Sequence, residues 1–138
     1  DLYSSYVTAT DALTTPISKE TAGIRLMKGL QSSSNPLMSY WSGYERHGSL
    51  WRGIRSCNTL IENMDNVVDM TQEEKDAWKA EAQFLKAFYH FTLLKYYGPI
   101  PITDENLPIS ANDQQVSVRR NTIDECITYI TVPPRDIL

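Results

Sequence analysis

The sequence predicts an all-α fold whose centre is a long hairpin of two helices. Apolar residues recur at helical spacing from Leu50 to Val68. A helix start signal follows at Thr71, and a second periodic segment then continues to Gly98. The 138 residues are enough for one domain with a core of modest size. We therefore expect residues 1–138 to form a single helical unit.

Charge and composition exclude several classes of function. The formal net charge of −4 is mild, and Lys and Arg do not cluster as they do in nucleic-acid-binding domains. No apolar run approaches the roughly 20 residues that a membrane-spanning helix needs. The sequence also carries no signal peptide and no polybasic segment for anionic lipid.

The segment before the hairpin predicts less regular structure. Residues 1–40 are rich in Ser and Thr, and a short helix is expected from about Pro16 to Leu30, where apolar residues recur at helical spacing. Two glycines inside that segment weaken the helix by roughly 1 kcal/mol each relative to Ala. Residues 32–36 are typical of a loop.

The first strong helix is expected to begin at Tyr44 or Gly48 and to end at Val68. Its buried stripe should consist of Leu50, Ile54, Cys57, Ile61, Met64 and Val68. Cys57 and Cys126 both fall on apolar stripes, so we expect two buried, unpaired thiols. Without a C-x-x-C pattern they offer no zinc site.

The second helix has the clearest boundaries. Thr71 and Glu74 form a capping box, in which each side chain bonds the backbone N–H of the other. Gly98 is expected to be an αL cap, and Pro99 prevents further extension. The helix should therefore cover residues 72–97.

The second helix also has two apolar faces, so neighbours should pack on both sides. One stripe contains Trp78, Ala82, Leu85, Tyr89 and Tyr96. The other contains Ala77, Ala80, Phe84, Ala87, Phe88 and Phe91. The first helix can cover one face only, so the second needs cover from residues 1–40, residues 119–130 or another chain. We expect antiparallel helices that bury Ile54, Ile61, Leu85 and Tyr89.

The hairpin is expected to cover about residues 48–97. After it, the chain should be extended and then helical again. Residues 98–118 form a Pro-rich exit and a polar loop. A second capping box, Thr122 with Glu125, predicts a helix over residues 122–130. Two prolines then end it abruptly with its apolar face partly used, which is typical of a truncated helix.

The sequence contains few features that indicate a catalytic site. The sequence has two histidines, His47 and His90, and we interpret His90 as a packed helical side chain. No H-E-x-x-H, P-loop, G-x-S-x-G or Gly-rich phosphate turn occurs. Helix caps and solvated helix faces explain the acidic residues better than a glycosidase pair does. We predict no enzyme activity, no catalytic residue, no cofactor and no metal.

Three aromatic residues beside a loop are the candidate ligand-binding residues: Tyr40, Trp41 and Tyr44. Flat aromatic rings bury the apolar faces of sugar rings, while Tyr hydroxyls remain available for hydrogen bonds. Packing at a helix end explains the same cluster, so both interpretations stay open. Trp51 and Trp78 lie at helical spacing and are expected in the core.

The hairpin sequence resembles the SusD/RagB family. Residues 80–102 follow the family pattern, which is roughly G-E-A-x-F-L-R-A-x-x-Y-F-x-L-v-x-x-Y-G-x-v-P-l. The family's preceding Y-x-x-I-x-x-A-N corresponds to Trp51, Ile54, Cys57 and Asn58. The segment that follows corresponds to Val118, Arg120, Thr122 and Glu125. Together these motifs cover about residues 48–130.

The chain also departs from the family pattern. Ala80 replaces the usual Gly, and Lys86 replaces the usual Arg. If Glu81 pairs with Lys86, the Lys supplies a point charge instead of a planar guanidinium. The family's next helix pattern is absent after Ile130, and family members are several times longer. The chain therefore resembles an N-terminal portion of a larger SusD-like fold.

The resemblance implies a non-catalytic lipoprotein on the outer face of a Gram-negative outer membrane, with its anchor outside this chain. Such proteins bind a polysaccharide, an oligosaccharide or another nutrient, and cover a SusC-like TonB-dependent transporter. Their tetratricopeptide-like helix pairs mainly contact that transporter. The spacing of Ala80, Phe84 and Ala87 is like the second helix of such a repeat, although both helices are longer than the usual unit of roughly 34 residues.

Two other functions stay open: a free-standing helical scaffold for a partner peptide, and a helical glycosidase fragment. An upstream lipoprotein signal with its Cys would favour the transporter-docking interpretation over the scaffold, and a sugar-release assay would test the glycosidase. Because part of the cover of the second helix is expected to be missing, the chain alone should bind polysaccharide weakly or not at all. It should also self-associate through apolar surface.

Overall fold

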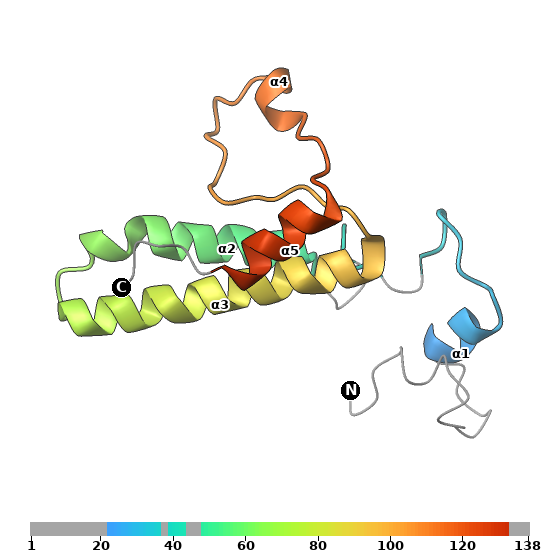
Figure 1. The fold of residues 1–138 in the computed structure, drawn as a ribbon, viewed down its shortest axis with the longest axis horizontal. Helices are drawn as coiled ribbons and strands as arrows, with labels where there is room; N and C mark the ends of the chain where they lie inside the picture. The colour runs from blue at the N-terminus through green and yellow to red at the C-terminus, as the bar shows by residue number, and fades with distance from the viewer. Residues whose placement is uncertain (1–21, 37–38, 44–47, 133–138) are drawn as a thin grey trace.

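The computed structural model describes residues 22–36, 39–43 and 48–132 (Figure 1). Its helices are α1 (Ala22–Met27), α2 (Leu50–Asn63), the 3-10 helix η1 (Met64–Asn66), α3 (Gln72–Tyr97), α4 (Asp113–Val116) and α5 (Ile123–Thr131). The described residues form helices and no strand, which confirms the all-α prediction. The helix predicted near the N-terminus is represented by α1, and residues 16–21 lie outside the described part.

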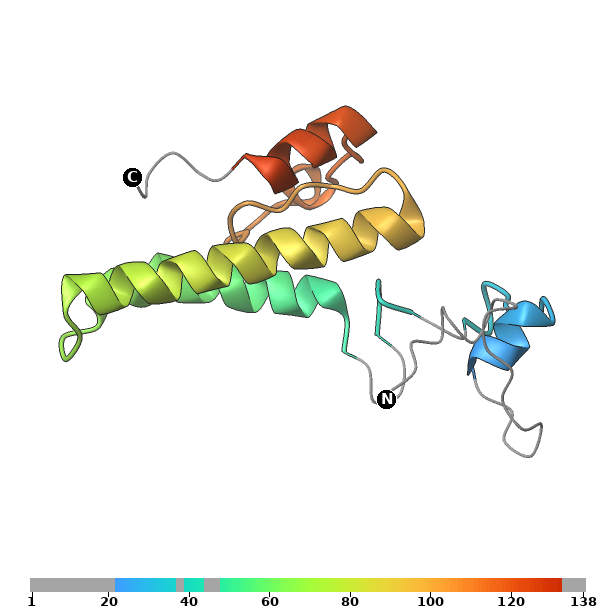
Figure 2. The ribbon, with the colours of Figure 1, turned by 60° about the horizontal axis from the view of Figure 1, so that its bottom comes forward.

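The two long helices, α2 and α3, form the predicted antiparallel hairpin, and α5 packs on α3 (Figures 1 and 2). Gly53 lies where α2 approaches α3 closely. A Cβ at this position would lie 2.9 Å from Cε2 of Tyr89. A glycine inside a helix costs roughly 1 kcal/mol relative to Ala, and the nearby Tyr89 ring is the structural reason for it here.

Helix α2 begins close to the predicted Gly48 and ends earlier than predicted. The Ser49 hydroxyl caps its first turn by accepting from the Trp51 N–H at 3.2 Å. Regular helix ends at Asn63, and Val68, predicted to belong to the buried stripe, is 98% exposed. The turn is rich in Asn and Asp, whose side chains compete for backbone hydrogen bonds and so favour the end of a helix.

The predicted boundaries of α3 are confirmed, together with its capping box. Thr71 Oγ1 accepts from the Glu74 N–H at 3.3 Å, and the Glu74 carboxylate accepts from the Thr71 N–H at 2.8 Å. The bond from the Thr71 N–H, with a second one from the Thr71 hydroxyl, holds the pKa of the Glu74 carboxyl below its usual value. The predicted αL cap at Gly98 is wrong in detail. Its φ of 69° is positive, but its ψ of −142° belongs to a different region that glycine alone readily adopts.

The core lies between the hairpin, the exit segment and α5. Its fully buried apolar side chains are Ile54, Leu93, Ile100 and Cys126. Ile54 is therefore buried as predicted, and Ile61 and Tyr89 are half-buried. Leu85 is 42% exposed and Trp78 is 50% exposed, so the predicted burial of both residues is wrong.

Helix α3 buries a stripe of which the apolar pattern marked only Ala82. Its buried residues are Ala82, Lys86, His90 and Leu93. Lys86 and His90 are polar, and they are enclosed because the exit segment supplies hydrogen-bond partners for both. Hydrophobic periodicity cannot detect a buried face of this kind.

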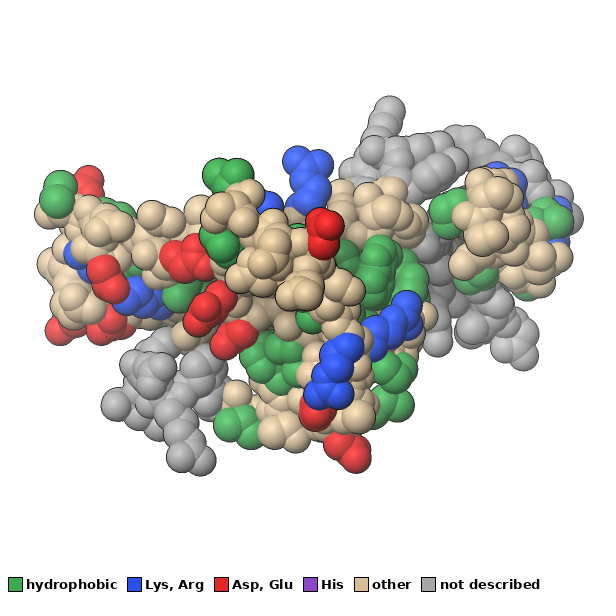
Figure 3. Space-filling model, turned by 90° about the horizontal axis from the view of Figure 1, so that it is seen from above, with side chains coloured by type: hydrophobic (Ala, Val, Ile, Leu, Met, Phe, Trp, Pro, Cys, Tyr) green, Lys and Arg blue, Asp and Glu red, His purple; other side chains and the backbone are tan. Residues whose placement is uncertain are grey.

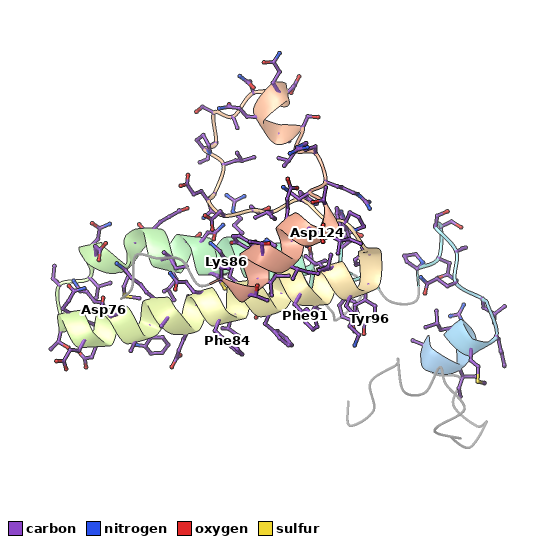
Figure 4. The ribbon with its side chains drawn as sticks, viewed as in Figure 1. Asp76, Phe84, Lys86, Phe91, Tyr96 and Asp124 are labelled. Atoms are coloured by element: carbon purple, nitrogen blue, oxygen red, sulfur yellow. The ribbon has the colours of Figure 1, made fainter. Side chains whose placement is uncertain are left out.

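The second apolar face of α3 has no cover from the described residues over its phenylalanines. Phe84, Phe88 and Phe91 are 71%, 51% and 50% exposed. Figure 4 shows Phe84 and Phe91 pointing away from α2 and α5. The cover expected from residues 119–130 is therefore not supplied by α5, which packs elsewhere on α3.

The exit segment, residues 99–104, turns back over the hairpin. The Asn121 N–H donates to the Ile100 carbonyl at 2.9 Å, and Asn121 Oδ1 accepts from the Ile102 N–H at 3.0 Å. The predicted polar loop contains the short helix α4, which was not predicted from the sequence, and α5 confirms the helix predicted over residues 122–130. Figure 3 looks onto this side of the molecule, where acidic side chains predominate toward the hairpin turn.

We expect Thr71→Ala to destabilise the protein by about 0.5–2 kcal/mol. The substitution removes the oxygen that accepts from the Glu74 N–H. Urea unfolding followed by circular dichroism measures the change. Thr92→Ala is a matched control, because the Thr92 hydroxyl donates to a carbonyl of its own helix at 2.8 Å and caps no N–H. An unchanged midpoint for Thr71→Ala would show that Thr71 is not the cap.

Cys57 and Cys126 are buried and unpaired, as predicted. Burial raises the pKa of the Cys57 thiol, which reduces its share of reactive thiolate. We expect iodoacetamide to label neither thiol in the folded protein and both thiols in urea without reductant. Intact-mass spectrometry counts the labels. A mass deficit of two hydrogens in the untreated chain would instead indicate a disulfide.

Candidate functional site

The candidate site lies at the open end of the hairpin, where α2 begins and α3 ends. The turn before α2 folds back onto this end. The Leu50 N–H donates to the Tyr40 carbonyl at 2.9 Å, and the Trp41 N–H donates to the Tyr97 hydroxyl at 3.2 Å. The Ser49 hydroxyl, which caps α2, also donates to the Trp41 carbonyl. These bonds fix two of the three predicted ligand-binding residues at the hairpin end.

Five aromatic side chains meet there, and we call them the aromatic cluster: Tyr40, Trp41, Trp51, Tyr96 and Tyr97. The Trp41 ring centroid lies 5.0 Å from that of Trp51 and 5.5 Å from that of Tyr97, both in edge-to-face geometry. The Arg120 guanidinium carbon lies 5.3 Å from the same Trp41 centroid, which is a cation–π contact. Trp41 therefore joins both hairpin helices to the segment before α5.

These packing contacts cover part of the rings of the predicted ligand-binding residues. Tyr40 packs against Tyr96 with ring centroids 4.8 Å apart, and Tyr40 and Trp41 are both half-buried. Tyr44 lies outside the described residues. These contacts are typical of packing at a helix end. A sugar ring could stack only on the part of the Tyr40 and Trp41 rings that remains accessible to solvent. Stacking of sugar on this cluster stays a proposal.

A group of polar side chains lies beside the core, and we call it the Asp104 network: Lys86, His90, Asp104 and Tyr129. Lys86 Nζ donates to Asp104 Oδ1 at 2.7 Å and to the Asp104 carbonyl at 2.8 Å. The Tyr129 hydroxyl donates to the same Oδ1 at 2.8 Å. The network thereby joins α3, the exit segment and α5, and Figure 4 labels Lys86 where α5 crosses α3.

The pKa values in the network follow from burial and these bonds. Burial raises the pKa of the Asp104 carboxyl, but hydrogen bonds from Lys86 and Tyr129, with the charge of Lys86, outweigh it and hold that pKa below its usual value. Burial, followed by the hydrogen bond to Asp104, raises the pKa of the Tyr129 hydroxyl. The carboxylate therefore stays ionised and the hydroxyl stays protonated, which are the states that these bonds require.

His90 is enclosed, at 1% exposure, and uses both ring nitrogens. Nδ1 lies 2.8 Å from the Lys86 carbonyl, and Nε2 accepts from the Thr103 N–H at 3.3 Å. Because a carbonyl only accepts and an N–H only donates, the ring is the neutral tautomer with its proton on Nδ1. Burial lowers the pKa of the His90 ring. The interpretation of His90 as a packed helical side chain is confirmed.

The acidic partner of Lys86 is not Glu81, the residue that the sequence analysis names for this pairing. Glu81 was the candidate, but residues five apart on a helix point about 140° apart. Lys86 pairs with Asp104, 18 residues later, and Tyr129 lies a further 25 residues on. No local spacing could reveal these two residues. The available signal was a Lys on the buried side of a helix, which needs a counter-charge from elsewhere in the chain.

Two open grooves lie on the hairpin surface. Residues of α2 line the first: Arg52, Arg55, Ser56, Thr59 and Leu60. Residues of α3 line the second: Ala80, Glu81, Phe84 and Leu85. Among the residues that the structure describes, no three His, Cys, Asp or Glu side chains gather as a metal site. Within the same residues, we find no helix with the length and apolar character to cross a membrane.

Residues 6–132 match the SusD-like family model, which is described as starch-binding and associating with the outer membrane. The match covers most of the chain and agrees with the motifs at residues 48–130. No curated protein matches the chain.

The solved structures that are similar to this chain include the following three. A SusD-like protein from Bacteroides fragilis is 24% identical, with a TM-score of 0.60, over 74% of this chain and 18% of its own. Surface glycan-binding protein A from Bacteroides uniformis is 26% identical, with a TM-score of 0.55, over 70% of this chain and 18% of its own. BT4246 is 29% identical, with a TM-score of 0.65, over 80% of this chain and 17% of its own. These structures confirm the predicted SusD-like helical fold, and the chain spans 17–18% of their length.

We expect the free energy of unfolding to fall as the pH drops below 6.5, the usual pKa of His. The unfolded chain binds a proton at His90 that the folded chain excludes, because the folded pKa is lowered, so acid favours unfolding. The carboxyl groups of Asp104 and Glu74 also have lowered pKa values, and they titrate below their usual values of 3.8 and 4.5. Their effect on stability therefore falls in a more acidic pH range than that of His90. Urea unfolding at pH values on either side of 6.5 measures the effect.

His90→Gln is the matched test, because an amide keeps a donor and an acceptor but does not titrate. The variant should show a flatter pH dependence between about 6.5 and about 5. A dependence as steep as that of the parent chain would assign the effect to another group.

Proposed function

The chain belongs to the SusD-like family, and on that premise we propose that it forms the helical docking portion of a non-catalytic, glycan-binding surface lipoprotein of the outer membrane. The proposed partner is a SusC-like TonB-dependent transporter, and the proposed ligand is a polysaccharide or oligosaccharide. The observation that carries the proposal is the family match over residues 6–132, which includes the whole hairpin. The chain spans 17–18% of the related structures. From the resemblance of its motifs we propose that it is an N-terminal portion of a larger SusD-like fold.

The described surface supports docking more than tight glycan capture. The hairpin presents a long exposed face, and the grooves on it are open. The Asp104 network is already engaged in holding α5 and the exit segment. We therefore propose that this chain alone binds polysaccharide weakly or not at all.

Any glycan contact within the chain is proposed at Tyr40, Trp41 and Tyr44. The half-buried rings of Tyr40 and Trp41 leave part of their surface for stacking. Bound sugar would lie at the open end of the hairpin, away from the α2–α3 turn.

A free-standing helical scaffold is the second candidate function. The specific observation that favours it is the row of exposed phenylalanines on α3. A lipoprotein signal with its Cys upstream in the same reading frame would decide for the docking function.

Two measurements on this chain test the proposal. Affinity electrophoresis in gels that contain starch should show little or no retardation. A transporter of the SusC-like class, solubilised from outer membranes of the same organism, should be retained on the immobilised chain. Strong retardation by starch with no transporter retained would overturn the docking proposal.

The sugar-contact residues need a control, because Trp41 also packs against Trp51 and Tyr97. Trp41→Ala should abolish any residual retardation. Trp78→Ala is the matched variant, since Trp78 is 50% exposed on α3 and takes no part in the aromatic cluster. Retardation that Trp41→Ala leaves unchanged would refute the assignment.

A further inference from the structure

One face of α3 carries an apolar row that continues along about four turns. We call it the phenylalanine face: Ala77, Ala80, Phe84, Ala87, Phe88 and Phe91. Its three rings are at least half exposed, and Figure 4 shows Phe84 and Phe91 on the side opposite α2 and α5. At 1.5 Å per residue the row is about 21 Å long. An exposed apolar row of this length marks an interaction surface.

Two large residues and two small ones on this face are arranged symmetrically about Phe84, while Ala87 has Glu81 as its counterpart. Ala80 precedes Phe84 by four positions, and Phe88 follows it by four. Ala77 precedes the same residue by seven positions, and Phe91 follows it by seven. Steps of four and seven return to one face of a helix. Each ring on one side of Phe84 therefore has a small residue at the same distance on the other side.

A two-fold axis through Phe84 turns this symmetry into complementarity. When two copies of α3 cross antiparallel, Phe88 of one copy faces Ala80 of the other, and Phe91 faces Ala77. Each ring then fills the space beside a small residue of the other copy. The two-fold axis repeats every such contact, as an isologous interface requires. We propose that the phenylalanine face is a self-docking surface, which a second copy of this chain binds antiparallel with Phe84 at the two-fold axis.

Charges near the ends of the face distinguish the two possible directions. Glu73 lies eleven positions before Phe84, and Lys95 lies eleven positions after it. Antiparallel pairing brings an acidic residue beside a basic one at both ends. Parallel pairing would set Glu73 against Glu73 and Lys95 against Lys95, and like charges repel. Electrostatics therefore favours the antiparallel arrangement.

The size of the face sets the strength of the association. One side of a single helix offers less than the roughly 800 Å² per partner of a standard interface. The dimer is therefore weak and depends on protein concentration. It uses α3 residues that the aromatic cluster and the Asp104 network do not use, so it is independent of the proposed glycan contact.

Cysteine cross-linking tests the register. Phe84→Cys should cross-link to itself on mild oxidation, because the axis passes through this position. Phe88→Cys and Ala80→Cys should cross-link poorly alone and well when the two proteins are mixed. Trp78→Cys is the matched control, since this position is exposed on α3 but lies off the face, so the variant should still associate without forming the cross-link. Self-cross-linking of Phe88→Cys would indicate parallel pairing and overturn the proposal.

Sedimentation equilibrium tests the complementarity without cross-links. Phe88→Ala should raise the dissociation constant by about tenfold or more. Adding Ala80→Phe to that variant should restore the association, because the large and the small residue exchange places within the same contact. A parent chain that is monomeric at every concentration, or a double variant as weak as Phe88→Ala, would overturn the proposal.

Discussion

The ion pair between Lys86 and Asp104 holds the chain beyond α3 in place. The Lys86 side chain is 8% exposed and that of Asp104 is 64% exposed, so one partner is enclosed and the other borders solvent. A pair with one side in water loses less hydration than a fully enclosed pair, while the enclosed ammonium still needs its counter-charge. Tyr129 bonds the same carboxylate, so a single side chain in the exit segment connects two helices. Removing Asp104 would leave the buried ammonium without a charged partner.

The core follows from where that pair holds the exit segment. Ile100 is fully buried with Cys126 from α5 and with Leu93 from α3, and none of the three could be enclosed if the exit segment pointed away from the hairpin. Asn58 adds a bond from α2, because its Nδ2 donates to the Thr103 carbonyl at 3.4 Å. Polar contacts thus set the path of the backbone, and the apolar contacts fill the space that this path encloses.

Local sequence signals predicted the helices well because their causes are local. The capping box at Thr71 acts within one turn, and it located the start of α3 correctly. The buried side of α3 has a non-local cause, since Lys86 and His90 are enclosed by residues that follow after the helix has ended. The error at Leu85 has the same origin, because an apolar pattern ranks residues by side-chain type and not by the partners available to them.

In the candidate site, too, local contacts were predictable from the sequence and non-local contacts were not. Tyr40 and Trp41 are neighbours in the sequence, so their meeting was predictable. Arg120 reaches Trp41 only because the loop between the exit segment and α5 returns to the hairpin end. Tyr97, which accepts from the Trp41 N–H, was visible as part of α3 but not as a partner of the turn before α2.

Two sides of α3 differ in a way that bears on where partners bind. The side with Lys86 and His90 is polar yet enclosed, and its hydrogen bonds are made within the chain. The opposite side carries Phe84, Phe88 and Phe91, which remain at least half exposed. Full burial of one such ring is worth roughly 1.5–3 kcal/mol, and much of that free energy is unrealised here. A partner that covers the phenylalanine side gains it, whereas a partner at the enclosed side would first have to break bonds that already exist. Association of this chain is therefore expected through the phenylalanine side, and changes at the enclosed side act on binding through the stability of the fold.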